Sequence, residues 1–444
     1  MSEFINNRSQ KQAALKDIIK KLHEGATVDQ VKADFDLLTT GVSALEITEM
    51  EQALVDEGMK VEDIQKLCDV HASVFKGSIE AFQSEETKAR ATFEEGHPVH
   101  TFKLENRKIE ALIDDELIPL LKLKTLEMEA IEKLRVGLEK LFQIDIHYRR
   151  KENLLFPFME KYEITAPPQV MWGVDDEIRA ELKRLKAFVN SNSEISETII
   201  EALLTLFEKI KEMIFKEEEI MFPMVIEKYS IEEWAEIERA SKEIGFAFLN
   251  TVKRWLPAEA KTSLVNIDLG SGQNVFSAEA NVMTQTGPSP QNRVKAEDPD
   301  IIVNRIQRDS KTIIPFDAGS LSSEEVNAIL NTIPFDMTFV GADNKVKYFT
   351  QGQERIFDRP ITIIGREVKH CHPPKSVHIV EQIVDDLRTG RKNHEDFWIK
   401  MGEQFVYIRY FAVRNKSGEF LGTLEITQNI KPITELEGEK RLMS

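Results

Sequence analysis

The chain has 444 residues, enough for about three domains at roughly 150 residues each. It is 41% hydrophobic and 30% charged, as expected for a soluble globular protein, and its net charge of −18 argues against nucleic acid or an anionic membrane surface as a partner. No apolar run approaches the ~20 residues that span a bilayer, and the N-terminus lacks an apolar signal core, so we expect a cytoplasmic protein.

Residues 1–76 are predicted to form a small helical domain, because apolar residues recur there at helical spacing. Its last helix contains Cys68 and His71, which are three residues apart and therefore lie on one helix face. Such a pair could bind a metal. The alternative is a buried cysteine beside a half-buried histidine, as in an ordinary core. The two cysteines of the chain, Cys68 and Cys371, predict no disulfide framework.

Residues 77–252 are predicted to form a helical bundle, because a helix ending occurs there twice. The first copy runs from His147 to Pro157, and the second runs from Met213 to Pro223, 66 residues later. Both copies end in Phe-Pro, and Glu152 in the first corresponds to Glu218 in the second. Two helices that end in the same way, with a helix between them, are typical of a duplicated four-helix bundle, where inward His and carboxylate side chains build metal sites.

Stripes of apolar residues predict five helices in this region. The first opens at Gly96-His97-Pro98, since proline is favoured at the first helical position. Pro167-Pro168 is expected to break the chain before the third helix. The other four helices are expected over 124–162, from Trp172 onward, over 195–228 and over 231–249.

The remaining sequence predicts a linker and a second kind of domain. Residues 253–320 are rich in Gly, Ser, Pro, Asn and Gln, which predicts a linker with a strand near Leu264–Leu269. Residues 321–435 alternate apolar and polar positions and predict an antiparallel sheet with helices on one face. Phe397 and Trp398, on one of its strands, are expected to be core or dimer contacts. The predicted elements are a helix over 322–330, a hairpin around 341–344, helical pieces around 355–357 and 376–389, and strands over 393–401, 404–415 and 419–428.

These motifs resemble known families. The doubled helix ending resembles the hemerythrin-like (HHE cation-binding) family, and the C-terminal domain looks like a PAS domain through Thr338-Phe-Val, Ile364-Gly-Arg366 and the strand Phe420–Glu425. With Cys371-His-Pro-Pro374, the chain is similar to bacterial proteins that fuse a small N-terminal helical domain of unknown function, a hemerythrin-like bundle and a PAS module. The resemblance implies a multidomain, mainly α protein that ends in an α+β PAS domain.

The resemblance also implies a centre of two non-heme irons, held by histidines on all four helices and by bridging carboxylates. The chain departs from that pattern at most positions. Family histidines match Asn106, the Asp175–Glu177 stretch and Met213, and Lys151 stands four residues after the retained His147. Glu217 keeps the carboxylate of the fourth helix. These departures argue against an oxygen-carrying di-iron centre of the usual kind.

A rebuilt metal site remains an alternative. His97, His100 and His147, together with Cys68 or His71, form a ligand mixture that suits zinc or iron. Heme is a rival occupant, with His100 or His147 as its axial ligand.

The carboxylates of the duplication are a second source of ligands. Glu152, Glu217 and Glu218 stand beside apolar residues, and unpaired inward carboxylates would cost several kcal/mol. A metal ion, or a lysine such as Lys151, would relieve that cost. Alternatively, Glu152 and Glu218 lie on a solvated edge.

The C-terminal domain contains His370-Cys371-His372, which could bind heme or iron. The alternative is that Pro373-Pro374, directly after it, stops a helix and shapes a loop.

These patterns favour a sensory or regulatory protein over an enzyme, although catalysis stays open. The bundle would hold iron, zinc or heme and respond to oxygen, nitric oxide or redox state, while the PAS domain would bind a ligand or form a homodimer. No kinase or DNA-binding segment is recognised after residue 432, so the output is expected through a partner protein that the sequence does not identify. The alternatives are a role in iron handling or iron-centre repair, and a cofactor-free interaction module.

Overall fold

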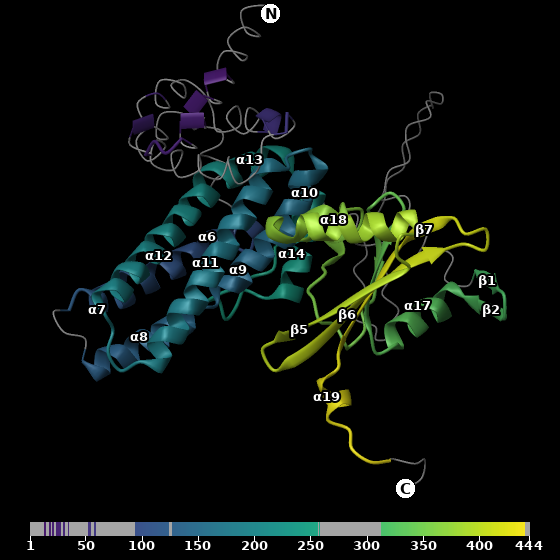
Figure 1. Ribbon diagram of the computed structural model, residues 1–444. Coiled ribbons are helices and arrows are strands. Elements are labelled where there is room, and N and C mark those ends of the chain that lie inside the picture. The colour runs from purple at the N-terminus through teal and green to yellow at the C-terminus, as the bar shows by residue number, and fades with distance from the viewer. Residues whose placement is uncertain are drawn as a thin grey trace, which may run out of the picture.

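The computed structural model describes residues 94–123, 127–255, 257 and 312–439, with isolated positions between 13 and 58. Cys68, His71 and the strand predicted near Leu264–Leu269 lie outside the described residues. The described part forms a helical bundle and a C-terminal α+β domain that lie side by side (Figure 1). None of the described helices is both long enough and apolar enough to cross a membrane.

The bundle packs its long helices around one apolar core. Phe102, Leu138, Leu182 and Phe207, each from a different long helix, are fully buried within it. The predicted helix over 124–162 is divided into shorter segments. The helices are α6 (Pro98–Ala111), α7 (Ile118–Leu121), α8 (Met128–Leu141), α9 (Ile144–Arg150), α10 (Phe156–Lys161), α11 (Ala166–Ser191), α12 (Glu197–Lys216), α13 (Phe222–Lys228) and α14 (Ile231–Ile244).

Prolines lie in the first turn of five of these helices, including α6 and α11. Pro98 occupies the first turn of α6, as predicted, and the His97 side chain caps that helix by accepting from the Val99 N–H at 3.2 Å. Pro167 and Pro168 lie in the first turn of α11. The predicted chain break at this point is therefore wrong, because prolines in a first turn remove only N–H groups that have no helical partner.

Three π-helical turns in the described bundle each lead into a proline. They are η2 (Leu112–Leu117) before Pro119, η3 (Lys151–Leu155) before Pro157, and η4 (Glu217–Met221) before Pro223. Proline lacks an N–H and clashes with the carbonyl four residues earlier, so the helix widens locally and backbone carbonyls are left for other partners. The duplicated helix ending is thus a matched pair of π turns, η3 and η4.

The C-terminal domain is an antiparallel five-stranded sheet with the strand order β4-β3-β7-β6-β5. The hairpin predicted around residues 341–344 is confirmed by the pairing of β3 with β4. The three C-terminal strands and the helix before them also match the predicted ranges within about two residues. The elements are α17 (Ser323–Thr332), β3 (Asp336–Gly341), β4 (Val346–Phe349), α18 (Pro374–Thr389), β5 (His394–Met401), β6 (Gln404–Arg414), β7 (Phe420–Asn429) and α19 (Lys431–Thr434).

Three details differ from the sequence predictions. A hairpin of β1 (Ile313–Phe316) and β2 (Gly319–Ser322) begins within the predicted linker and ends two residues past it. The helical piece expected at 355–357 is irregular, and short 3-10 turns follow at η5 (Ile361–Ile363) and η6 (Val368–Cys371). Pro373 and Pro374 begin α18 instead of stopping a helix.

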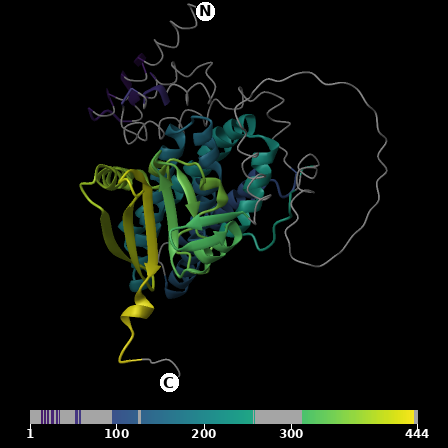
Figure 2. The same ribbon diagram turned by 90° about the vertical axis from the view of Figure 1, so that its right-hand side faces the viewer.

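Two elements of the C-terminal domain, α18 and η5, pack against the bundle. α18 packs on β6 and β7 and also contacts α11, while η5 contacts η3, α10 and α14. Figure 2, turned by 90° from Figure 1, shows the sheet in front of the bundle. The π turn η3 therefore faces the bundle centre on one side and the C-terminal domain on the other.

Candidate functional site

A buried lysine lies at the centre of the bundle. Lys151 is fully buried, and its Nζ donates to Asp175 Oδ1 at 2.9 Å and to Glu217 Oε1 at 2.6 Å. Nζ also lies 4.5 Å from the centre of the Tyr148 ring. Burial alone would lower the pKa of Lys151, but the two carboxylates raise it above its usual value. The lysine is therefore a charged ammonium held between α11 and η4.

His147 lies beside this ammonium and uses both ring nitrogens. Nδ1 is 2.8 Å from Glu105 Oε2, and Nε2 is 3.0 Å from Glu217 Oε2. Burial opposes the charged ring, yet Glu217 and Glu105 raise the pKa of His147 to about 9. An imidazolium donates from both nitrogens, which matches these two contacts. Burial would likewise raise the pKa of Glu217, but Lys151 and His147 lower it to about 2.

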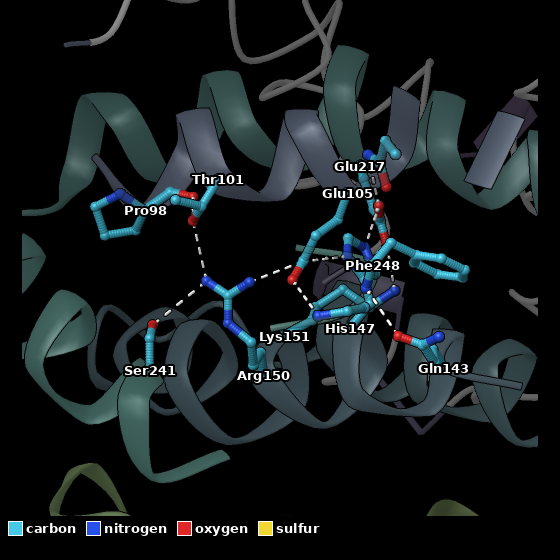
Figure 3. Close-up of polar contacts among 12 residues, drawn as sticks. Pro98, Thr101, Glu105, Gln143, His147, Arg150, Lys151, Glu217, Ser241 and Phe248 are labelled. Atoms are coloured by element: carbon cyan, nitrogen blue, oxygen red, sulfur yellow. Dashed lines mark hydrogen bonds and ion pairs between the residues drawn. The ribbon is translucent and has the colours of Figure 1, made fainter. Parts of the chain in front are cut away.

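Arg150 extends the charged cluster toward α6 and α14 (Figure 3). Its guanidinium donates to Glu105 Oε2 at 2.8 Å, to Thr101 Oγ1 at 3.1 Å and to Ser241 Oγ at 3.4 Å. The ring of Phe102 lies 4.3 Å from the guanidinium carbon, so the charge is also in contact with an aromatic face. Glu105 thus joins Arg150 to His147, and its other oxygen accepts from a backbone N–H at 2.7 Å.

The glutamates of the duplication have arginine partners at the edge of this cluster. Glu152 is buried and receives two parallel hydrogen bonds from Arg179, at 2.7 and 2.9 Å. Glu218 is more exposed and pairs with Arg107 at 2.6 Å. Asn106 donates to Glu218 at 3.1 Å and to Glu217 at the same distance.

The C-terminal domain is attached at the carbonyls that the η3 turn leaves free. The Asn153 carbonyl, four residues before Pro157, accepts from Thr362 Oγ1 at 2.7 Å. Arg366 donates two hydrogen bonds of 2.7 Å to the carboxylate of Glu160. Both partners of this fork are nearly fully buried, so it is a specific contact between the two domains.

A pocket of about 1300 Å³ lies next to this contact. Asn153 and Trp172 line it from the bundle, and Cys371 and His372 line it from the C-terminal domain. Much of the remaining lining is aliphatic and includes Val340, Ile363, Val380 and Ile408. Burial lowers the pKa of His372 and raises the pKa of the Cys371 thiol to about 11. Both side chains therefore face the pocket in their neutral forms.

Family models match three parts of the chain. Residues 97–225 match the hemerythrin HHE cation binding domain, and residues 326–431 match a PAS domain. The middle of this chain is a hemerythrin HHE domain, and its C-terminal part is a PAS domain. Residues 15–81 match a family of unknown function, DUF438. The resemblance read from the sequence is thereby confirmed for all three parts.

Solved structures match parts of the chain. A C-terminal domain from Streptococcus mutans is 39% identical over 29% of this chain and 100% of that chain, with a TM-score of 0.28. A PAS domain from Colwellia psychrerythraea is 12% identical over 25% of this chain and 98% of its own, with a TM-score of 0.21. A sensory box sensor histidine kinase from Vibrio cholerae is 10% identical over 24% of this chain and 90% of its own, with a TM-score of 0.19. No curated protein matches the chain.

The hemerythrin match implies a cation-binding site in the bundle. The residues at its centre do not fit a metal ion, because both ring nitrogens of His147 and both oxygens of Glu217 already have partners. Both nitrogens of His147 contact carboxylates, and Glu217 and Asp175 accept from Lys151. A metal ligand needs a free lone pair, which an imidazolium does not have. Within the described ranges, no group of three or more His, Cys, Asp or Glu side chains could hold a metal ion.

The histidines predicted to rebuild a metal site do not converge with His147. His97 caps α6, and its ring packs against Trp234 and Trp255 at 4.9 and 4.6 Å. Burial lowers the pKa of His97 to about 3, so the ring is neutral. His100 is half-buried, and its Nδ1 has no hydrogen-bond partner among the described residues.

The carboxylate and PAS predictions have mixed outcomes. Glu152 is not on a solvated edge, since Arg179 accompanies it into the interior. Lys151 does relieve a buried carboxylate, but the partners are Glu217 and Asp175. In the PAS domain, His370 lies 3.5 Å from Glu160 at the interface, whereas Cys371 and His372 line the pocket.

Sequence reasoning missed several residues of the charged cluster. Glu105 lies on the apolar stripe of α6, between Phe102 and Ile109, and a carboxylate at such a position is a readable signal of a buried partner. Arg150 and Arg179 carried no such signal, because charged residues on helices are usually solvated.

Proposed function

We propose that this chain is a cytoplasmic sensory protein in which the PAS pocket binds a ligand and the hemerythrin-like bundle responds to it. The observation that supports this function is the pocket of about 1300 Å³, which residues from both domains line. Ligand pockets are mostly apolar cavities with a few polar groups, often at domain interfaces. A ligand held there would contact Trp172 of the bundle and His372 of the PAS domain together.

Heme is the ligand class that suits this pocket best. The volume exceeds the roughly 300–1,000 Å³ of ordinary small-molecule sites, and the aliphatic lining suits a large apolar ring. His372 is the residue that would bind the heme iron, since its neutral ring has a lone pair for iron. Cys371 is less suited, because burial keeps its thiol protonated. A bound heme would make the protein responsive to oxygen, nitric oxide or redox state.

The contact between the domains offers a route for the response. Arg366 lines the pocket and also forms the fork with Glu160 at the end of the duplicated helix. A ligand that displaced Arg366 would weaken this fork and alter the docking of the PAS domain on η3. The iron-handling alternative has less support, because it needs a metal centre that the bundle residues do not fit.

The test is titration of the purified full chain with hemin, followed by absorption spectroscopy with carbon monoxide and nitric oxide. We expect a Soret band at one heme per chain, and a shifted or lost band in His372→Ala. His394→Ala, an exposed histidine on β5 outside the pocket, is the matched control and should leave the band unchanged. Absence of a saturable band would reject heme, and an identical spectrum in His372→Ala would reject that ligand.

A homodimer through the PAS domain is a second part of the proposal. β5 is one of the two edge strands of the five-stranded sheet, and Trp398 on it is 62% exposed. An exposed apolar edge strand is a template for pairing with another strand. An antiparallel pairing of two β5 strands about Trp398 would place Asp396 opposite Lys400 and Phe397 opposite Ile399. This register matches opposite charges and apolar side chains, so a second copy of the chain fits the edge.

A further inference from the structure

The positive charge at the bundle centre comes from the duplicated helix itself. Lys151 and Glu217 are equivalent residues of the two copies, and each begins a π turn. Asp175, from the middle of α11, completes the pair of carboxylates around the ammonium. All three side chains are fully buried. An ammonium needs such partners to leave water, and these carboxylates equally need a cation.

The charges around this centre balance within the cluster. Three carboxylates face three cationic side chains. Lys151 pairs with Asp175 and Glu217, and Arg150 pairs with Glu105. The ring of His147 contacts Glu105 through one nitrogen and Glu217 through the other. Every charge at the centre therefore has an opposite charge supplied by the chain. An additional divalent ion would leave an excess of buried positive charge.

We propose that the Lys151 ammonium is the resident cation of this hemerythrin-like bundle, so that a side chain occupies the place of a bound metal ion. The bundle then folds and remains charge-balanced without metal. The cation-binding centre is thus a structural cluster of charged side chains. The bundle can therefore fold whether or not iron is available.

The surrounding residues would form a metal site if the ammonium were removed. Glu105 is hydrogen-bonded to Nδ1 of His147, and the other ring nitrogen, Nε2, points toward Glu217. A carboxylate on the far ring nitrogen is the arrangement that orients histidines in metal sites. Asp175 Oδ2 has no hydrogen-bond partner among the described residues, so this carboxylate could offer an additional oxygen. Lys151→Ala should therefore create a site for a divalent ion with His147, Asp175 and Glu217 as ligands.

The experiment compares the full chain with three variants, all purified without chelator or a metal-affinity tag. Bound metal is counted after dialysis against Mn²⁺ or Zn²⁺, and the thermal midpoint is measured with and without EDTA. We expect the unaltered chain to bind no stoichiometric Mn²⁺ or Zn²⁺, and its thermal midpoint to be the same with and without EDTA. Lys151→Ala should melt at a lower temperature, bind about one metal per chain and regain stability with it.

The other two variants separate the role of the cation from that of the residue. Lys151→Arg keeps a positive charge and should take up no metal. Lys140→Ala, at a half-exposed lysine that pairs with Glu116 on the surface, should behave like the unaltered chain. If Lys151→Ala is unfolded, refolding from urea with Mn²⁺ or Zn²⁺ should restore it.

Three results would overturn the proposal. One is stoichiometric Mn²⁺, Zn²⁺ or non-heme iron in the unaltered chain, with a thermal midpoint that falls in EDTA. Another is a folded Lys151→Ala variant that binds no metal. The third is an unfolded Lys151→Ala variant that neither ion restores.

Discussion

Lys151 and Glu217 occupy equivalent positions in the two copies of the duplicated helix ending, and their side chains are hydrogen-bonded to each other at 2.6 Å. Each residue begins the π turn that precedes Phe-Pro. The duplication has therefore produced opposite charges at matched positions, and the two helices meet through them. Because the pair is buried, the stability of the bundle depends on the whole set of charges around it.

Glu105 should be the most sensitive carboxylate of this set. Glu105→Ala leaves the buried guanidinium of Arg150 without a carboxylate partner and leaves the ring of His147 with Glu217 alone. We expect the free energy of unfolding to fall by about 3–5 kcal/mol, the usual cost of breaking a buried ion pair. Urea denaturation followed by circular dichroism would measure this.

Glu129→Ala provides the matched control for that prediction. Glu129 is an exposed glutamate of α8 that pairs with Lys133 on the surface. Its replacement should leave the free energy of unfolding nearly unchanged, because exposed ion pairs contribute little to stability. Equal losses in Glu105→Ala and Glu129→Ala would mean that the buried cluster contributes nothing special to stability.

Stability should decline at alkaline pH because of His147. Its pKa is raised from 6.5 in the unfolded chain to about 9 in the folded protein. A raised pKa means that the folded state binds the proton more tightly, so this contribution is complete below pH 6.5 and is lost as the pH rises toward 9. Urea midpoints between these two pH values should decrease in the unaltered chain. His147→Gln should flatten that decrease, and an unchanged slope would exclude His147 as its source.

Glu217 should give the opposite dependence in acid. Its pKa is lowered from 4.5 to about 2, so the stability it contributes is present above pH 4.5 and is lost as the pH falls toward 2. Urea midpoints over this range should fall in the unaltered chain. Glu217→Gln should remove this part of the acid dependence. If it does not, other carboxylates cause the acid unfolding.

The fork between Arg366 and Glu160 should hold the PAS domain against the bundle. Arg366→Lys keeps the charge but cannot form the two parallel bonds to Glu160. We expect faster amide exchange around η3 and η5 and easier proteolytic separation of the domains. Arg391→Lys is the control, because Arg391 pairs with Asp385 and Asp386 on the surface of the PAS domain. Unchanged exchange in Arg366→Lys would show that the other interface contacts suffice.

The sequence predicted the architecture well because its signals were local. The repeated Phe-Pro ending, the apolar stripes and the alternating strands each follow from the periodicity of one element. The sequence did not predict the contact that this ending makes with the C-terminal domain. Pro157 widens the helix into η3, and the Asn153 carbonyl is left to accept a hydrogen bond from Thr362. No sequence pattern gives that partner, which lies 209 residues away in the chain.

The site was predicted less well because it depends on pairing between helices. Lys151 was visible as a departure from the hemerythrin pattern, and a lysine was considered as the partner of a buried carboxylate. To predict Asp175 and Glu217 as its partners, one must know how α11 and η4 are rotated about their axes relative to each other, and the sequence does not give this. The histidine spacing near Pro98 suggested ligands, but His97 is a helix cap in the structure.

The proposed homodimer gives the sharpest test of the PAS edge, since its register pairs Asp396 with Lys400 of the other copy. Lys400→Asp would place two acidic side chains opposite each other at both ends of the contact and should convert a dimer to a monomer in sedimentation experiments. The double variant Asp396→Lys with Lys400→Asp restores opposite charges and should restore the dimer. Lys416→Asp, an exposed lysine between β6 and β7, is the control and should remain dimeric. A monomeric unaltered chain, or a double variant that stays monomeric while Lys416→Asp is dimeric, would exclude this register.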